Sequence, residues 1–169
     1  MKEVFYFLCF LFLASCKMQN TEKVTYPRQI GDIGYDAKLD NPNFIPCNGD
    51  DKILQYFNKG KGLEYKGGKK EIEGVFEKKY TDVEVDESGL IRIRFIVNCK
   101  GETGRFRVIQ MNENYEQFTF DNRITNQLLI LTKGLDGWKI KEDGRGSKID
   151  YYQYLIFKIE KGNLIEILP

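Results

Sequence analysis

The chain has 169 residues, of which 41% are hydrophobic and 14% aromatic, a composition that suffices for the core of one globular domain. Its 26 basic and 25 acidic residues nearly cancel, which argues against a nucleic-acid surface, since such surfaces carry a basic excess. The chain contains no histidine, so serine–histidine triads are excluded and the commonest general base is missing. We therefore expect no enzyme, no metal site and no cofactor, and we identify no catalytic residue.

The first apolar segment, residues 4–14, has about half of the roughly 20 residues that an α-helix needs to cross a bilayer. Its length suits the hydrophobic region of an export signal, and Lys2 supplies a positive charge before it. The letters LASC that end at Cys16 resemble the lipobox of bacterial lipoproteins, which implies a signal peptide over residues 1–15 and acylation of Cys16. The alternative is an ordinary cleaved signal with a chance cysteine.

Removal of the signal peptide and acylation of Cys16 leave two cysteines, Cys47 and Cys99, in a compartment where disulfides persist. A bridge between them would close a loop of about 53 residues and stabilise the fold by on the order of 4 kcal/mol. The alternative is two separately buried thiols, because a sequence cannot show whether the two Cα atoms approach each other. Two thiols without histidine also leave too few of the usual ligands for zinc.

Residues 16–48 contain three of the four prolines and show no sustained periodicity, so we expect a tether and N-terminal extension that becomes ordered towards residue 47. A single domain should then occupy residues 49–169. It is expected to open with a short helix, capped at Asp50 or Asp51, that carries Ile53, Leu54 and Phe57 on one face.

The next two elements have clear periods. Residues 69–80 predict an amphipathic helix, because their apolar side chains recur at helical spacing. These side chains are Ile72, Val75, Phe76 and Tyr80. From Gly89, apolar residues alternate as in a half-buried strand, and Cys99 falls in phase with the inward set. Turn residues at 98–104 then predict a hairpin whose second strand covers residues 106–111.

The last third of the domain predicts one more helix and a final apolar run. Asp121 or Asn122 can cap a helix that ends at the glycines after residue 133. A polar turn at 142–147 precedes the run 151–168, and its interruption at 161–163 permits two strands around a turn or one bulged strand. The order of elements predicts an α+β fold in which a small antiparallel sheet packs on two helices.

Several landmarks over residues 64–160 resemble the C-terminal domain of TonB-type energy transducers. They are Gly67-Gly68 before a helix that ends at Tyr80, the strand pattern G-x-I-x-I-x-F-x-V-N from Gly89, Gly101-Glu102, and Gly137-Trp138-Lys139 after a helix with Leu-x-x-Leu spacing. The chain departs from that family at Ile140, where proline is usual, in the polar and aromatic connection 112–121, and at Cys99 in the hairpin turn.

In TonB proteins this domain grips a segment of an outer-membrane receptor by adding strands edge to edge. Such strand addition takes its affinity from main-chain hydrogen bonds and needs no special side chains. The resemblance therefore implies an exposed edge, which we expect around Tyr151 to Ile159, with Tyr152, Tyr154 and Ile156 as candidate partner-binding residues. The alternative is that the tyrosines merely cover the sheet, since aromatic residues are ordinary in strands.

The expected anchor changes what such a domain can do. An energy transducer needs a transmembrane helix and a long stiff spacer, whereas this chain offers a lipid and a tether with a relaxed span of roughly 30 Å. We therefore expect a non-catalytic lipoprotein on the periplasmic face of the outer membrane of a Gram-negative bacterium, where it binds an envelope or outer-membrane protein and no nucleic acid. Lys17 agrees with that placement, because an aspartate there often retains lipoproteins in the inner membrane. The alternatives are a structural accessory subunit of an outer-membrane assembly and a TonB-like energy transducer.

Overall fold

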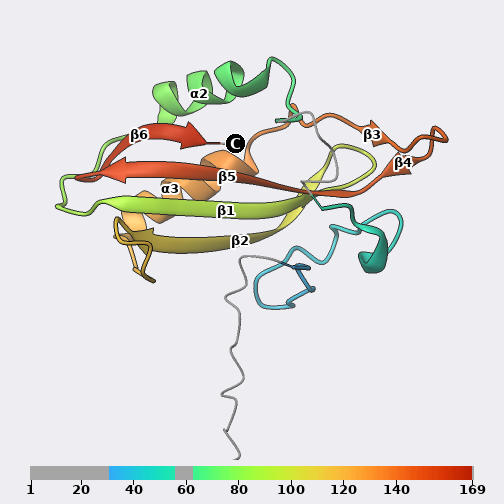
Figure 1. Cartoon of the computed structure of the whole chain (residues 1–169), viewed down its shortest axis with the longest axis horizontal. Helices are drawn as coiled ribbons and strands as arrows, with labels where there is room; N and C mark the ends of the chain where they lie inside the picture. Colours follow the sequence, from blue (N-terminus) through green and yellow to red (C-terminus); the bar gives the residue numbers. More distant parts are fainter. Residues whose placement is uncertain (1–30, 56–62, 169) are drawn as a thin grey trace, which may run out of the picture. The chain divides into compact units, whose positions relative to one another are not determined.

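The computed structural model describes residues 31–55 and 63–168. The chain forms two units, Met1–Gly31 and Asp32–Pro169, and the second unit contains the described helices and strands. Its centre is a four-stranded antiparallel sheet with the strand order β2-β1-β5-β6 (Figure 1). The strands are β1 Gly89–Val97, β2 Thr103–Asn112, β5 Tyr151–Glu160 and β6 Asn163–Leu168. The apolar run 151–168 thus forms two strands around a turn.

Two helices cover one face of this sheet. Helix α2, Gly68–Lys79, buries Ile72 and Phe76, and the ring of Phe76 lies 5.0 Å from that of Phe157 on β5. Helix α3, Asn122–Lys133, begins where the Asp121 side chain accepts a hydrogen bond from the N–H of Arg123. Both predicted helices are confirmed, and so is the α+β class with two helices on an antiparallel sheet.

The opposite face of the sheet is covered in part by the segment before the domain. Ile33, Phe44 and Ile53 pack there with Ile96 of β1 and Tyr152 of β5. This cluster explains why Ile96 is fully buried although the alternation of β1 points it away from the helices. Residues 32–48, which we predicted to belong to the tether, are therefore part of the folded unit.

The short helix predicted at residues 50–57 is wrong in extent. The structure contains a 3-10 helix, η2, over Asp50–Lys52, and the chain is extended at Ile53. Leu54 then pairs with β5, because its N–H donates to the carbonyl of Asp150 and its carbonyl accepts from the N–H of Tyr152, both at 2.9 Å. The free backbone groups at the start of β5 therefore draw this segment out of the helical conformation. Phe57 lies outside the described residues.

A small second sheet follows α3. Strands β3, Lys141–Glu142, and β4, Lys148–Ile149, pair antiparallel around the predicted polar turn. Asp143 closes this turn by accepting hydrogen bonds from the N–H groups of Arg145 and Ser147 at 2.8 and 2.9 Å. The chain enters β5 directly after β4, so this hairpin also positions Asp150 at the end of the main sheet.

Candidate functional site

Cys16, the predicted site of the lipid, lies outside the described residues. In the ranges 31–55 and 63–168, no helix combines the length and the apolar character needed to cross a bilayer. The lipid anchor and the signal peptide therefore stay predictions of the sequence.

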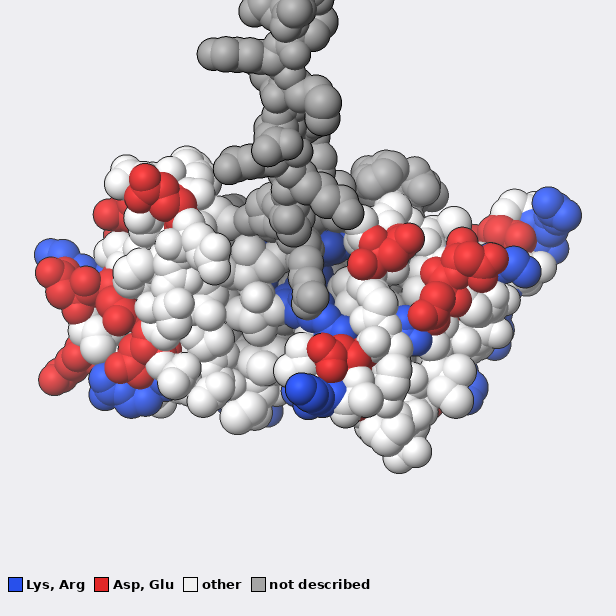
Figure 2. Space-filling model, turned by 90° about the horizontal axis from the view of Figure 1, so that it is seen from below, with Lys and Arg blue, Asp and Glu red and all other residues white. Residues whose placement is uncertain are grey.

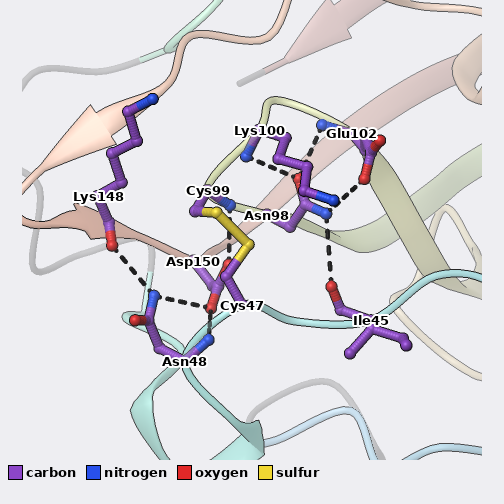
Figure 3. The surroundings of a disulfide bond; sticks show 9 residues. All are labelled: Ile45, Cys47, Asn48, Asn98, Cys99, Lys100, Glu102, Lys148 and Asp150. Atoms are coloured by element: carbon purple, nitrogen blue, oxygen red, sulfur yellow. Dashed lines mark hydrogen bonds between the residues drawn. A yellow bond between two sulfur atoms is a disulfide. The ribbon is translucent and has the colours of Figure 1, made fainter.

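Cys47 and Cys99 form a disulfide with their Cα atoms 5.9 Å apart (Figure 3). The predicted bridge is therefore present, and it joins the N-terminal extension to the turn between β1 and β2. Strand β1 ends at Val97, and Cys99 lies half-buried in the turn that was predicted at residues 98–104. The turn residues after Val97 divert the chain before the inward alternation can continue.

A buried carboxylate connects the two sides of this disulfide. Asp150 is fully buried, and one of its oxygens accepts from the N–H of Cys99 at 2.8 Å. The other oxygen accepts from the backbone N–H and the side-chain amide of Asn48, at 2.8 and 3.1 Å (Figure 3). The two sulfurs and the carboxylate lie within 4.8 Å of one another. Because both sulfurs are in the disulfide, the cluster offers a metal no thiolate, and we interpret it as a structural clamp.

The expected exposed edge at Tyr151 to Ile159 is wrong. Strand β5 pairs with β1 on one side and with β6 on the other, so it is an inner strand. The reason is that the chain turns at Lys161 and Gly162 and returns as β6, which takes the edge position beside β5.

The three candidate binding residues on β5 accordingly lie within the sheet. Tyr152 is 2% exposed and its hydroxyl accepts from the N–H of Ile33 at 3.1 Å. The guanidinium carbon of Arg92 lies 4.3 Å from the centroid of the Tyr154 ring. Ile156 pairs with Arg92 on β1 and with Leu168 on β6. These residues cover the sheet, as in the alternative interpretation, and do not form a free edge.

The edge formed by β2 is occupied in part by other parts of the chain. Arg107 binds both carboxylate oxygens of Asp40 at 2.7 Å, which attaches the extension to this strand. This pairing lowers the pKa of Asp40 below its ordinary value. Farther along β2, the carbonyl of Gln110 accepts a hydrogen bond from the N–H of Phe118. The N–H of Asn112 donates to the carbonyl of Glu116, in the turn that follows the strand. The outward backbone groups of Gln110 and Asn112 are thus bonded within the chain, whereas those of Val108 have no backbone partner among the described residues.

The outer edge of β6 is open among the described residues. The N–H of Tyr152 donates to the carbonyl of Leu54, which lies on the side of β5 that does not face β1. Because this direction alternates along a strand, the even-numbered residues of β5 all turn their backbone groups away from β1 and towards β6. Lys158 therefore exchanges hydrogen bonds with Glu166, and Ile167 turns its N–H and C=O outward. In residues 31–55 and 63–168, no backbone group bonds to that outward side of Ile167. The outward groups of Ile167 are therefore available to an added strand, next to a register shift between the Lys158–Glu166 and Ile159–Leu164 pairs.

A groove of about 300 Å³ runs beside this open edge. Its walls come from α2, from the segment after α2, and from β6, and Figure 1 shows α2 alongside β6 at this side of the sheet. Its lining residues are Glu73, Phe76, Glu77, Tyr80, Asp82, Leu164, Ile165, Glu166 and Ile167. Phe76 and Ile167 are buried, whereas Ile165 is 51% exposed. The groove thus combines apolar surface, four carboxylates and a free strand edge.

Tyr80 fixes the end of the groove. Burial raises the pKa of Tyr80 to about 12, and the charge of Asp82 adds to this effect. Its hydroxyl donates to the carbonyl of Gly162 at 3.0 Å, in the turn that leads into β6. Tyr80 is therefore neutral at physiological pH and ties the C-terminal end of α2 to the β6 turn. The spacing between helix and strand edge is held by this contact and by the packing of Phe76.

Sequence reasoning missed this groove. Glu73 and Glu77 follow each other at helical spacing, as do Phe76 and Tyr80, so the pattern does show that α2 has one face with acidic and aromatic residues. The missing information was the partner of that face, because β6 lies far away in the sequence. The turn at residues 161–163 was the one available signal that a last strand exists.

Comparisons of the chain with models of protein families, with curated proteins and with solved structures found no match. The resemblance to TonB-type domains therefore remains a sequence-based expectation. The structure establishes the α+β class and the order of the strands.

Proposed function

We propose that this protein is a non-catalytic, lipid-anchored envelope protein that binds another protein by β-strand addition. The observation that carries the proposal is the open outer edge of β6, which borders a groove walled by α2. Strand addition needs unpaired backbone groups at a strand edge and a surface for alternate side chains, and this site offers the outward groups of Ile167 and the groove beside them. The β6 edge replaces Tyr152, Tyr154 and Ile156 as the proposed binding surface.

The choice of β6 also follows from which other surfaces of the sheet are covered by the chain itself. The helices cover one face, residues 32–55 cover part of the other, and the β2 edge is bonded to Asp40 and to the turn after Asn112. Proteins commonly blunt exposed edges in such ways, because an unpaired ladder invites another strand. A strand edge with unpaired backbone groups beside a groove that offers apolar and acidic side chains is what a strand-binding module requires.

The lipobox-like sequence that ends at Cys16 supports the proposed location. A chain that starts at an acylated cysteine is held at a membrane surface, and the disulfide agrees with an oxidising compartment. The proposed partner is therefore an envelope or outer-membrane protein. Mass spectrometry of the mature N-terminus tests the anchor directly: we expect a diacyl or triacyl modification on Cys16, and an unmodified Cys16 on a secreted chain would contradict the proposed location.

A site-specific photo-crosslinker tests the binding edge. We would place it at Ile165 in the full-length protein in its own membrane, and at Ile130 as a control, because both side chains are exposed, at 51% and 68%. Ile130 lies on α3 and is not among the residues that line the groove. We expect a discrete protein adduct from position 165 that position 130 does not form. Equal labelling from both positions, or none from position 165, would contradict strand addition at β6.

A second candidate function is a structural subunit whose β6 edge is permanently covered in a larger assembly. The half-exposed Ile165 favours this alternative, since apolar side chains at a permanent interface are buried by the partner. Size measurement after mild detergent extraction distinguishes the two functions. A stable large complex indicates the permanent subunit, and a monomer that forms the position-165 adduct only in the membrane indicates the reversible binder.

A further inference from the structure

We infer that the groove beside β6 selects an extended protein segment in which basic side chains alternate with apolar ones. The inference rests on the proposed strand addition and adds the chemistry of the partner. It is carried by the charge of the groove: four of the nine lining residues are acidic and none is basic.

The four carboxylates come from both walls of the groove. Glu73 and Glu77 lie on α2, Asp82 lies in the segment after it, and Glu166 lies on β6. On the face drawn in Figure 2, by contrast, acidic and basic residues are both present, with uncharged residues between them. The single sign of charge is therefore a property of the groove lining and is not shared by that face.

The chain neutralises the charge at the end of the groove where Glu73 and Glu166 lie, and Lys158, which pairs with Glu166 from β5, contributes to this. The ammonium of Lys69 lies 3.4 Å from a carboxylate oxygen of Glu73 and 3.9 Å from one of Glu166. All three side chains are more than a third exposed, so these contacts are weak. Within the described part of the chain, neither Glu77 nor Asp82 has a basic group within ion-pair distance. The end of the groove near Tyr80 thus has negative charge to offer a partner.

The geometry of an added strand brings both of its faces to these carboxylates. Side chains of a strand alternate between two sides, so one set would lie between β6 and α2 and the other beside Glu166. The first set would meet Phe76 and Ile167 with Glu77 nearby. Apolar side chains suit the first set, which faces Phe76 and Ile167. Lysine and arginine suit the second set, because their aliphatic stems cover apolar surface while the charged ends reach carboxylates.

The same charges argue against a second copy of this chain as the occupant. Pairing of β6 with β6 would bring two sets of four carboxylates together, and like charges across adjacent strands are destabilising. They also argue against an acidic segment and against phosphate groups. The remaining occupant with complementary charge is a basic extended segment of another protein.

Three matched peptides test the inference against the whole mature protein. Each alternates valine with one other residue, which is lysine, glutamine or glutamate, and each is blocked at both ends. Binding would be followed by amide chemical shifts and by fluorescence anisotropy. We expect the lysine peptide to shift the amides of residues 163–168 and to bind about tenfold more tightly than the glutamate peptide, a difference of about 1.4 kcal/mol. Salt at ~0.5 M should remove most of this preference.

Charge-neutralising variants complete the test. Glu77→Gln combined with Glu166→Gln should bring the affinity for the lysine peptide close to that for the glutamine peptide, and Glu142→Gln, on β3, should leave it unchanged. If all three peptides shift the β6 amides with equal affinity, strand addition stands and the charge inference is overturned. If none shifts them, both are overturned. If the lysine peptide binds but the double variant has no effect, the groove is not its site and the inference fails.

Discussion

Replacement of Asp150 by asparagine should be severely destabilising, because the carboxylate is fully buried and accepts three N–H groups. An amide has one acceptor oxygen, so it can serve either Cys99 or Asn48. The other side then faces an NH₂ group, and a buried N–H left without an acceptor costs about 1–3 kcal/mol. The hydrogen bonds that remain at residue 150 become weaker, because their acceptor is no longer charged. Removal of a buried charge is itself favourable and offsets part of the lost stability. We expect a net loss of about 3 kcal/mol.

The assay is urea unfolding of the oxidised protein, with the disulfide verified by mass, together with the midpoint of thermal unfolding. A loss of about 3 kcal/mol should lower Tm by roughly 10 °C for a domain of this size. Asp143→Asn is the matched control, because Asp143 also accepts backbone N–H groups, from Arg145 and Ser147, but in an exposed turn. That variant should lose less than about 1 kcal/mol. Equal small losses in both variants would refute the interpretation of Asp150 as a buried clamp.

Three further predictions concern the extension and its attachments. Reduction of the disulfide should lower the free energy of unfolding by on the order of 4 kcal/mol, measured in urea with and without reductant, because the bridge spans 52 positions of sequence. Gly104→Ala would place a methyl group 2.2 Å from the ring of Phe44, so residues 32–48 should become sensitive to protease; an unchanged cleavage rate would contradict this packing. Arg107 lowers the pKa of Asp40 below 3.8, so their pairing stabilises the fold above that pH and the contribution disappears as pH falls below it. Asp40→Asn should flatten this part of the pH profile of the urea midpoint, and an unchanged slope would contradict the assignment.

The arrangement around the sheet connects these structural predictions with the proposed function. The disulfide, Asp150 and the Asp40–Arg107 pair all hold residues 32–55 against the outer face and the β2 edge. Their effect is to keep residues 32–55 over part of the sheet face opposite the helices and beside Arg107 of β2. Loss of these attachments should therefore expose more of the sheet, and under the proposed function this would add surface to which another chain could bind.

The local elements could be predicted from the sequence alone, because each one follows from residues that are near one another. Helical spacing from Ile72 to Tyr80 predicted α2, alternation from Gly89 predicted β1, and Asp121 marked the start of α3. The disulfide could be expected for a different reason, since only two cysteines remain beyond Cys16 and an oxidising compartment favours their pairing. The class of fold then followed from the order of the elements.

Only the tertiary structure decided which strand is an edge and which segment is a tether. Strand order depends on hydrogen bonds between residues far apart in the chain, and the periodicity of β5 is the same whether it has one neighbour or two. The extension shows no period because it is irregular, and it is held by a few buried side chains such as Ile33 and Phe44. The groove likewise depends on contacts between distant parts of the chain, because its residues lie on α2, on the segment after it and on β6. Only the packing of α2 on the sheet brings their carboxylates together beside the edge of β6.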